Sequence, residues 1–276
     1  MHYRIPSAAQ TTGTYTTDQL REEFLAQGLF KAGEANFRWW EVDRTIMGGI
    51  VPTTAALDLP NRPELRSEFF LERREAGAIN LGGPGLAVVD GVEYAFGAMD
   101  TLYLGRGTRT VSFASKQAAN PARIWFVSYP AHAVYPVRHI PFASVQGNRL
   151  GTPEGANQRT LYKVIYPGAF PTCQIVMGFT RMESGSVWNT MPSHTHLRRS
   201  EVYLYYDVPE NQGVFHFMGA PQSTRHLVVR NLEAVLSPNW SIHSGVGTAA
   251  YSFVWCMGGE NQEFTDMDPA PVTELR

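Results

Sequence analysis

The chain of 276 amino acids has little cysteine and little lysine. Cys173 and Cys256 are too few for a disulfide framework, and their spacing matches no zinc knuckle. We therefore expect free thiols in a reducing cytoplasm. Lysine occurs only at positions 31, 116 and 163, so the other 20 of the 23 basic residues are arginines. The planar guanidinium of arginine suits carboxylates and phosphates, but a GC-rich coding sequence would also explain this excess.

The chain also lacks a strong charge and a long hydrophobic run. Its formal net charge is −2 at pH 7, which gives no basic footprint for nucleic acid and no polybasic patch for a membrane surface. The first thirty residues show no apolar stretch after a basic start, and no window approaches the roughly 18 apolar residues of a spanning helix. We expect a soluble, cytoplasmic protein with no nucleic-acid partner and no membrane association.

Helical periodicity is rare, and the one helix that the pattern predicts lies in an N-terminal arm, residues 1–36. Thr16 is its expected N-cap, and Gln19 stands three residues later, as in a capping box. Apolar residues from Leu20 onward follow on one stripe, and the helix should end before Gly28. The arm is expected to be an addition to the first domain.

The rest of the chain reads as short extended runs, such as 69–74, 160–166 and 201–206, separated by turns rich in glycine and proline. Spacings of roughly 8–15 residues between turns favour an antiparallel sandwich or barrel, so the predicted fold class is all-β.

Length and turn composition together predict two domains. A chain of 276 residues exceeds the usual size of one domain, about 100–150 residues. The polar segment 146–158 is the best linker because its residues favour turns over periodic structure. The predicted domains are therefore 1–150, including the arm, and 151–276.

Two histidines and a glutamate in the second half form the strongest chemical pattern. If the segment from His194 to His196 is extended, the period of two points both imidazoles to one face, where two nitrogens can bind one ion. Glu201 lies five residues beyond His196, so a bend between them is needed to bring its carboxylate to that face. His243 follows a turn at Pro238 and offers a fourth donor. Three histidines and one glutamate suit a divalent transition metal.

Several segments resemble the family of 5-keto-4-deoxyuronate isomerases, within the cupin superfamily. The His-x-His pair, the nearby glutamate and the later histidine resemble the two metal motifs of cupins in general. Further segments extend the similarity to nearly the whole chain. The matching segments are 194–206, 218–228, 237–251 and 255–262, and in the first half 90–91, 100–103 and 130–132.

The resemblance implies two tandem cupin domains, which are jelly-roll β-barrels, with a metal only in the second. It implies His194, His196, Glu201 and His243 as ligands of one divalent ion per subunit, most simply Zn²⁺, and a homohexamer. The implied activity is an aldose–ketose isomerisation in pectin and uronate breakdown. It converts 5-dehydro-4-deoxy-D-glucuronate to 3-deoxy-D-glycero-2,5-hexodiulosonate.

The reaction that the resemblance implies also requires a base and a group that binds the substrate's carboxylate. A proton must move between C2 and C1, and the ion would stabilise the charge that develops on their oxygens. Glu201 is one candidate base, although metal ligation lowers a carboxylate's basicity and favours a separate group. Other candidate bases are His226, Tyr206 and Glu260, because they lie in the segments that resemble the family. Arg199 and Arg225 are the arginines expected to hold the carboxylate.

Three other functions remain open from the sequence. The related 5-deoxy-glucuronate isomerase of inositol breakdown would share the fold, metal and reaction type but not the substrate. A cupin dioxygenase would use redox iron. A non-catalytic sugar-binding or storage cupin should have lost one or more metal ligands, whereas this chain has all four.

Overall fold

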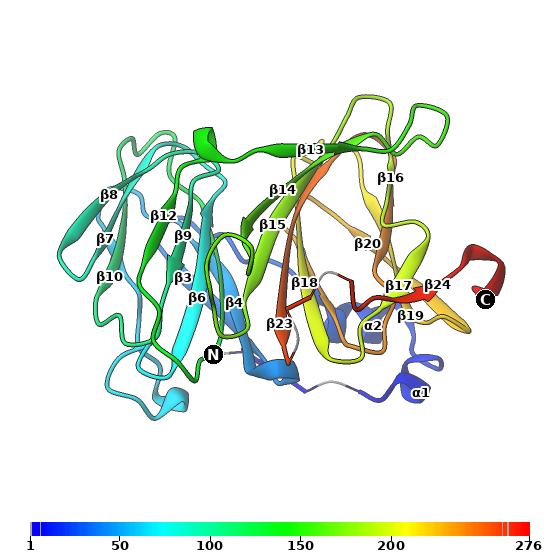
Figure 1. Ribbon diagram of the computed structural model, residues 1–276, viewed down its shortest axis with the longest axis horizontal. Helices are drawn as coiled ribbons and strands as arrows, with labels where there is room; N and C mark the ends of the chain where they lie inside the picture. Colours follow the sequence, from blue (N-terminus) through cyan, green and yellow to red (C-terminus); the bar gives the residue numbers. More distant parts are fainter. Residues whose placement is uncertain (1, 6, 261, 264) are drawn as a thin grey trace. The chain divides into compact units, whose positions relative to one another are not determined.

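The computed structural model describes residues 2–5, 7–260, 262–263 and 265–276 (Figure 1). Its regular structure is almost entirely β, so the predicted fold class is confirmed. The chain forms two compact units. Unit 1 contains Met1–Arg4, Gly28–Val145 and Val164–Val176, and unit 2 contains Ile5–Gln27, Gln146–Lys163 and Met177–Arg276.

Unit 1 consists of a seven-stranded sheet and a four-stranded sheet. Its short 3-10 turns are η1 (Val42–Arg44), η2 (Pro63–Leu65) and η3 (Phe142–Ser144). Its strands are β1 (His2–Arg4), β3 (Ala35–Trp40), β4 (Thr45–Ile50), β5 (Leu57–Asp58), β6 (Arg74–Asn80), β7 (Gly85–Val89), β8 (Val92–Phe96), β9 (Thr101–Leu104), β10 (Val111–Ser115), β11 (Ile124–Pro130) and β12 (Arg138–Ile140). The larger sheet has the order β1-β3-β4-β11-β6-β9-β12, and the smaller has β5-β10-β7-β8.

The core of unit 1 lies between these two sheets. Phe37 on β3 and Phe126 on β11 belong to the same buried cluster as Val89 on β7 and Phe113 on β10. Because the inward side chains of both sheets are apolar, they fill the interior in the manner of a β-sandwich.

Unit 2 has the same plan, a seven-stranded and a four-stranded sheet, with one additional strand pair. It also contains helices α1 (Ala9–Thr12) and α2 (Thr17–Phe24) and the 3-10 turn η4 (Val272–Glu274). Its strands are β2 (Leu25–Ala26), β13 (Gly147–Leu150), β14 (Arg159–Ile165), β15 (Val176–Met182), β16 (Trp188–Asn189), β17 (Ser193–Thr195), β18 (Arg199–Tyr206), β19 (Val214–Ala220), β20 (Ser223–Val229), β21 (Ala234–Ser237), β22 (Ser244–Gly247), β23 (Ser252–Gly259) and β24 (Asp268–Ala270). The sheet orders are β13-β14-β15-β23-β18-β21-β2, β16-β22-β19-β20 and β17-β24.

The predicted helix is present as α2, with both hydrogen bonds of the capping box between Thr16 and Gln19. It ends earlier than expected because Leu25 becomes extended and pairs with Val235 of β21. Phe24 is fully buried and packs edge-on against Trp240, at a ring-centroid distance of 6.2 Å. The apolar stripe of the helix thus packs within unit 2, so the assignment of the whole arm to the first domain was wrong.

The predicted linker is partly a strand. Residues 147–150 form β13, whose Leu150 pairs with Arg159 of β14. All four of its residues are exposed, so no hydrophobic alternation reveals the strand in the sequence. The boundary at residue 150 therefore lies inside unit 2, which begins again at Gln146.

A buried carboxylate explains why Val164–Val176 groups with unit 1. Glu75 on β6 is fully buried and accepts hydrogen bonds from the backbone N–H groups of Cys173, Gln174 and Ile175 at 2.8, 2.6 and 2.8 Å. It also accepts from the Tyr103 hydroxyl at 2.7 Å. Four donors satisfy the carboxylate and fasten this connection to β6.

The described residues contain no helix that is long and apolar enough to cross a membrane. The longer of the two helices, α2, has eight residues.

Candidate metal centre and active site

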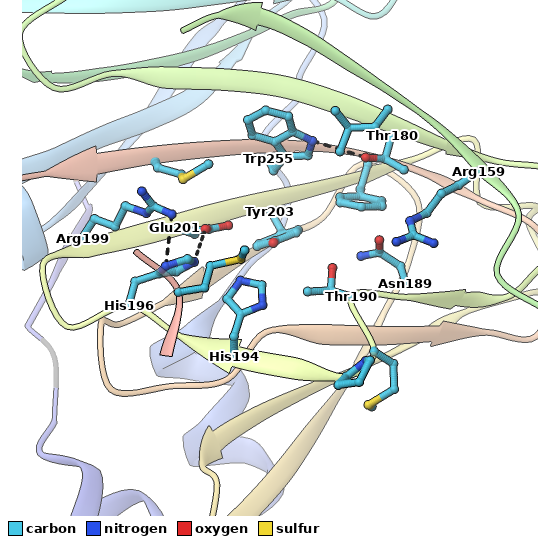
Figure 2. A pocket seen from close by; sticks show the side chains of 16 residues that line it. Arg159, Thr180, Asn189, Thr190, His194, His196, Arg199, Glu201, Tyr203 and Trp255 are labelled. Carbon is cyan, nitrogen blue, oxygen red and sulfur yellow. Dashed lines mark hydrogen bonds and ion pairs between the residues drawn. The ribbon is translucent and has the colours of Figure 1, made fainter. Parts of the chain in front are cut away.

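Four side chains of unit 2 converge as the sequence predicted. His194 lies on β17, His196 follows that strand directly, Glu201 lies on β18, and His243 immediately precedes β22. One potential ligand atom from each residue lies within 4.8 Å of all the others. Nε2 of His243 is 3.0 Å from Nε2 of His194, and Nε2 of His196 is 2.9 Å from Oε1 of Glu201. Figure 2 shows His194, His196 and Glu201 directed toward one another.

Local hydrogen bonds explain this convergence. Strand β17 ends at Thr195, and the expected bend follows before β18 begins at Arg199. The backbone N–H of His196 donates to the carbonyl of Asn239 at 3.3 Å, and the side-chain amide of Asn239 donates to the carbonyl of Leu197 at 3.1 Å. These two bonds join the bend to the proline turn that precedes His243. On its other side, β17 pairs with β24, where His194 stands opposite Pro269.

At neutral pH His194, His243 and Glu201 have the protonation states that binding of a divalent metal requires. Burial lowers the pKa of His194 to about 3 and that of His243 to about 4, so both imidazoles are neutral. Burial alone would raise the pKa of the Glu201 carboxyl, but His243 and His196 offset it and lower that pKa well below its ordinary value. Neutral imidazole nitrogens and one carboxylate, facing one another in a buried place, fit a transition-metal ion.

Arg199 supports this cluster from behind. Its side chain is buried, and its guanidinium lies 3.1 Å from Nδ1 of His196 and 2.9 Å from Oδ1 of Asp266. Oδ1 of Asp266 is 3.8 Å from the same imidazole nitrogen. Arg199 lines the cavity, as a carboxylate clamp must, but Asp266 already balances its charge. The pair instead holds the ring of His196 in position.

The cluster opens into a cavity of about 420 Å³, within the usual range for small-molecule sites, roughly 300–1,000 Å³. Three of the four predicted ligands line it (Figure 2). The complete lining is Arg159, Leu161, Thr180, Asn189, Thr190, Met191, Pro192, His194, His196, Arg199, Glu201, Tyr203, Phe253, Trp255, Met257 and Met267.

The other predicted bases do not line this cavity. His226 is exposed on β20, where its ring lies 5.8 Å from that of Phe215. Tyr206 is buried one residue beyond Tyr205 on β18, which directs it to the other face of the strand, and burial raises its pKa to about 12. Glu260 is exposed after β23. Sequence similarity drew attention to these three residues, but it carries no information about which face of a strand they occupy.

The expectation for Arg225 was also wrong. Its guanidinium donates to the backbone carbonyls of Gly13 and Tyr15, at 2.8 and 2.6 Å. Arg225 is absent from the cavity lining because it fastens the N-terminal arm to β20.

Sequence reasoning missed several polar residues of the cavity, among them Tyr203, Arg159 and Asn189. The Tyr203 hydroxyl hydrogen bonds to Glu201 and to Thr190, and burial first, then Glu201, raises its pKa well above the ordinary value. The alternation of β18 places Tyr203 on the same face as Glu201, so this residue could have been found. Arg159 and Asn189 could not, because nothing local distinguishes them from other arginines and asparagines.

Comparisons with known proteins identify the family of this chain. A family model described as the KduI/IolB family matches residues 29–271. Two curated relatives are named 4-deoxy-L-threo-5-hexosulose-uronate ketol-isomerase. The relative from Lachnoclostridium phytofermentans is 49% identical over 276 residues and covers 100% of both chains. The relative from Formosa agariphila is 50% identical and covers 99% of this chain and 98% of its own.

A solved structure supports the fold at much lower sequence similarity. An IolB-like protein from Salmonella typhimurium is 13% identical, with a TM-score of 0.70, and the match covers 87% of this chain and 94% of that one. The fold and the sequence matches along nearly its whole length show that this chain belongs to the KduI/IolB family.

Proposed function

We propose that this protein is a metal-dependent aldose–ketose isomerase that acts on 5-dehydro-4-deoxy-D-glucuronate in the breakdown of pectin and related uronates. The product is 3-deoxy-D-glycero-2,5-hexodiulosonate. One observation carries the proposal: four convergent metal donors lie beside a cavity in a chain about half identical, along its full length, to ketol-isomerases.

The four donors would hold one divalent ion, which we expect to be zinc. When bound, such an ion supplies Lewis-acid stabilisation of negative charge on the C1 and C2 oxygens. The imidazoles of His194 and His243 are neutral at pH 7 and so are ready to bind it. The lining offers Trp255, Phe253 and Met257 as an apolar wall that limits access of water to the reacting carbons.

Among the predicted bases, Glu201 alone lines the cavity. It is ionised at neutral pH because the surrounding imidazoles lower its pKa. We assign the transfer of the proton between C2 and C1 to the carboxylate oxygen of Glu201 that would not bind the ion, because ligation lowers the basicity of the other oxygen. The hydroxyl of Tyr203 hydrogen bonds to Glu201 and thereby holds it in one orientation.

The rival substrate is 5-deoxy-glucuronate, because the family also includes IolB proteins. The strength of the relationships favours the first substrate. The named ketol-isomerases are about 50% identical to this chain, whereas the IolB-like structure is 13% identical and shows the fold alone.

Turnover of both uronates by the purified, metal-analysed protein tests the proposal. We expect isomerisation of 5-dehydro-4-deoxy-D-glucuronate without oxygen consumption, at a kcat/KM at least tenfold above that for 5-deoxy-glucuronate. Higher activity on the second substrate would reverse the assignment, and oxygen-dependent turnover would indicate a dioxygenase. Binding without turnover of either would indicate a sugar-binding protein.

We also propose that the protein is a cytoplasmic homohexamer and that unit 1 supports its assembly. A second, metal-free barrel with its own core is well suited to a symmetric interface. Light scattering should give a hexamer at micromolar concentration, and a monomer would refute this part of the proposal.

A further inference from the structure

Arg159 is a cation inside the cavity, apart from the metal donors. It is the first residue of β14, it is half-buried, and it lines the same cavity as His194 and Glu201. Figure 2 shows its guanidinium directed into the cavity beside Asn189, well away from the cluster of His196 and Glu201. The cavity therefore has two polar regions of different chemistry.

No acidic side chain in the described part of the chain forms an ion pair with Arg159. Its guanidinium donates a hydrogen bond to the backbone carbonyl of Asn157, at 2.8 Å. Burial lowers its pKa from the ordinary value, which shows the cost of desolvating this charge. Arg199 differs in this respect, because Asp266 balances it. A partly desolvated guanidinium without a carboxylate partner is a ready site for an anion.

Asn189 provides a second, independent observation. Its side chain is buried, and its Nδ2 has no hydrogen-bond partner among the described residues. A buried amide donor that lacks an acceptor costs free energy, which an acceptor on a ligand would recover. Strand β16 places this amide beside the guanidinium of Arg159 (Figure 2).

We propose that Arg159 and Asn189 bind the carboxylate of the substrate. The inference rests on the proposed function and deepens it. An open-chain hexuronate carries its aldehyde at C1 and its carboxylate at C6, so the reacting and anionic groups are at opposite ends. Binding C6 at Arg159 directs C1 and C2 toward Glu201 and the metal donors. The pair thus determines both the direction in which the substrate lies and the preference for acids over neutral sugars.

Binding of a matched pair of ligands isolates this interaction. D-glucuronate and D-glucuronamide have nearly the same shape, but only the first is an anion. Titration calorimetry on the metal-loaded protein should show tighter binding of D-glucuronate by roughly 10- to 100-fold, as expected for a hydrogen-bonded charge. Arg159→Met should abolish this preference while leaving the weaker binding of D-glucuronamide unchanged. Arg159→Lys should restore part of it, because the charge remains but the planar fork is lost.

Arg198→Met is the matched control, since it removes one positive charge from an exposed residue outside the cavity. It should retain the full preference for the acid. With the uronate substrate, Arg159→Met should lower kcat/KM by roughly 10- to 100-fold. A merely structural role would weaken both ligands equally.

The proposal is overturned if wild-type protein binds both ligands equally, or if Arg159→Met keeps the preference. Failure of the proposed function would look different. In that case wild-type protein would prefer D-glucuronate, and lose the preference with Arg159→Met, yet would isomerise no uronate.

Discussion

The two units share the same arrangement of strands but differ in the side chains that these strands direct into the interior. In unit 2, β18 lies between β23 and β21, and Glu201 pairs with the last residue of β21. In unit 1, β6 lies between β11 and β9 in the same way, and Ala76 pairs with the last residue of β9. By this register Ala76 stands where Glu201 stands, and Ala78 stands where Tyr203 stands.

Apolar side chains accordingly fill the interior of unit 1. Ala76 and Ala78 belong to its buried apolar cluster, in which the rings of Phe37, Phe70 and Phe126 lie 5.3–5.9 Å apart. The metal-competent cluster found among the described residues lies in unit 2. The comparison shows that the sheets supply a scaffold, whereas a few inward residues decide between a packed core and a site.

Placing the glutamate of unit 2 into unit 1 should be the most damaging change. Ala76→Glu would bury a carboxylate among phenylalanines, with no imidazole or metal to compensate it, and should cost at least about 3 kcal/mol of folding stability. Urea unfolding measures the loss. Ala95→Glu on β8 is the control, because Ala95 is exposed and the same change should cost less than about 1 kcal/mol there. If both variants were equally stable, Ala76 would not occupy a buried position equivalent to that of Glu201.

Removing a ligand from unit 2 should make it chemically similar to unit 1 without unfolding it. His243→Ala should lower turnover at least about 10²-fold, because a Lewis-acid ion contributes several kcal/mol to charge stabilisation. Circular dichroism should remain native, since two β cores stabilise the fold. His226→Ala, at an exposed histidine outside the cavity, should keep near-normal turnover. Normal activity of His243→Ala in protein shown to be metal-free would end the metal mechanism.

A buried imidazole should make unit 2 sensitive to acid. His216 is fully buried, with Nδ1 2.7 Å from the Tyr205 hydroxyl, and burial lowers its pKa to about 3. Since its pKa is higher in the unfolded chain, about 6.5, the unfolded state binds more protons between pH 6.5 and 3. Stability should therefore fall through this window as the pH decreases.

At pH 5 this single histidine should cost about 2 kcal/mol relative to pH 7. Urea unfolding of metal-free protein at both pH values provides the measurement. His216→Gln removes the titrating group and should show a pH dependence smaller by about that amount. An unchanged dependence would show that His216 already titrates near its ordinary pKa.

The smallest expected effect concerns the arm that packs within unit 2. Thr16→Ala removes the side chain that accepts the Gln19 N–H at the start of α2 and should cost about 1 kcal/mol. Thr14→Ala is the control, because its hydroxyl makes an exposed bond to the carbonyl of Thr11 outside α2. Equal effects of both changes would mean that the cap contributes nothing specific.

Local patterns explain which features the sequence predicted. The capping box at Thr16 and the shared face of His194 and His196 depend on spacings of two or three residues, so both can be recognised in the sequence. Strand β13 was missed because none of its side chains is buried. Glu75 was missed because its three backbone partners lie about 100 residues away.

Arginine roles were the least predictable part of the site. Arg225 meets carbonyls more than 200 residues away in sequence, and Arg199 meets Asp266, so tertiary contacts alone decide which guanidinium remains available for a ligand. Arg159 and Asn189 reach the cavity from β14 and β16, which lie in different sheets. No spacing rule connects two such positions.

The pairing of β17 with β24 has a consequence for how the site is made. Ser193 donates to the carbonyl of Ala270, 77 residues further along the chain, so the strand that fixes His194 is synthesised after every ligand. A translation product that stops between residues 260 and 267 would contain all four donors and every strand up to β23, but it would lack β24, the strand that holds the first donor. We expect such a product to fold most of its sheets and still fail to assemble the four-donor site. The active protein can therefore form only after Ala270 has been synthesised.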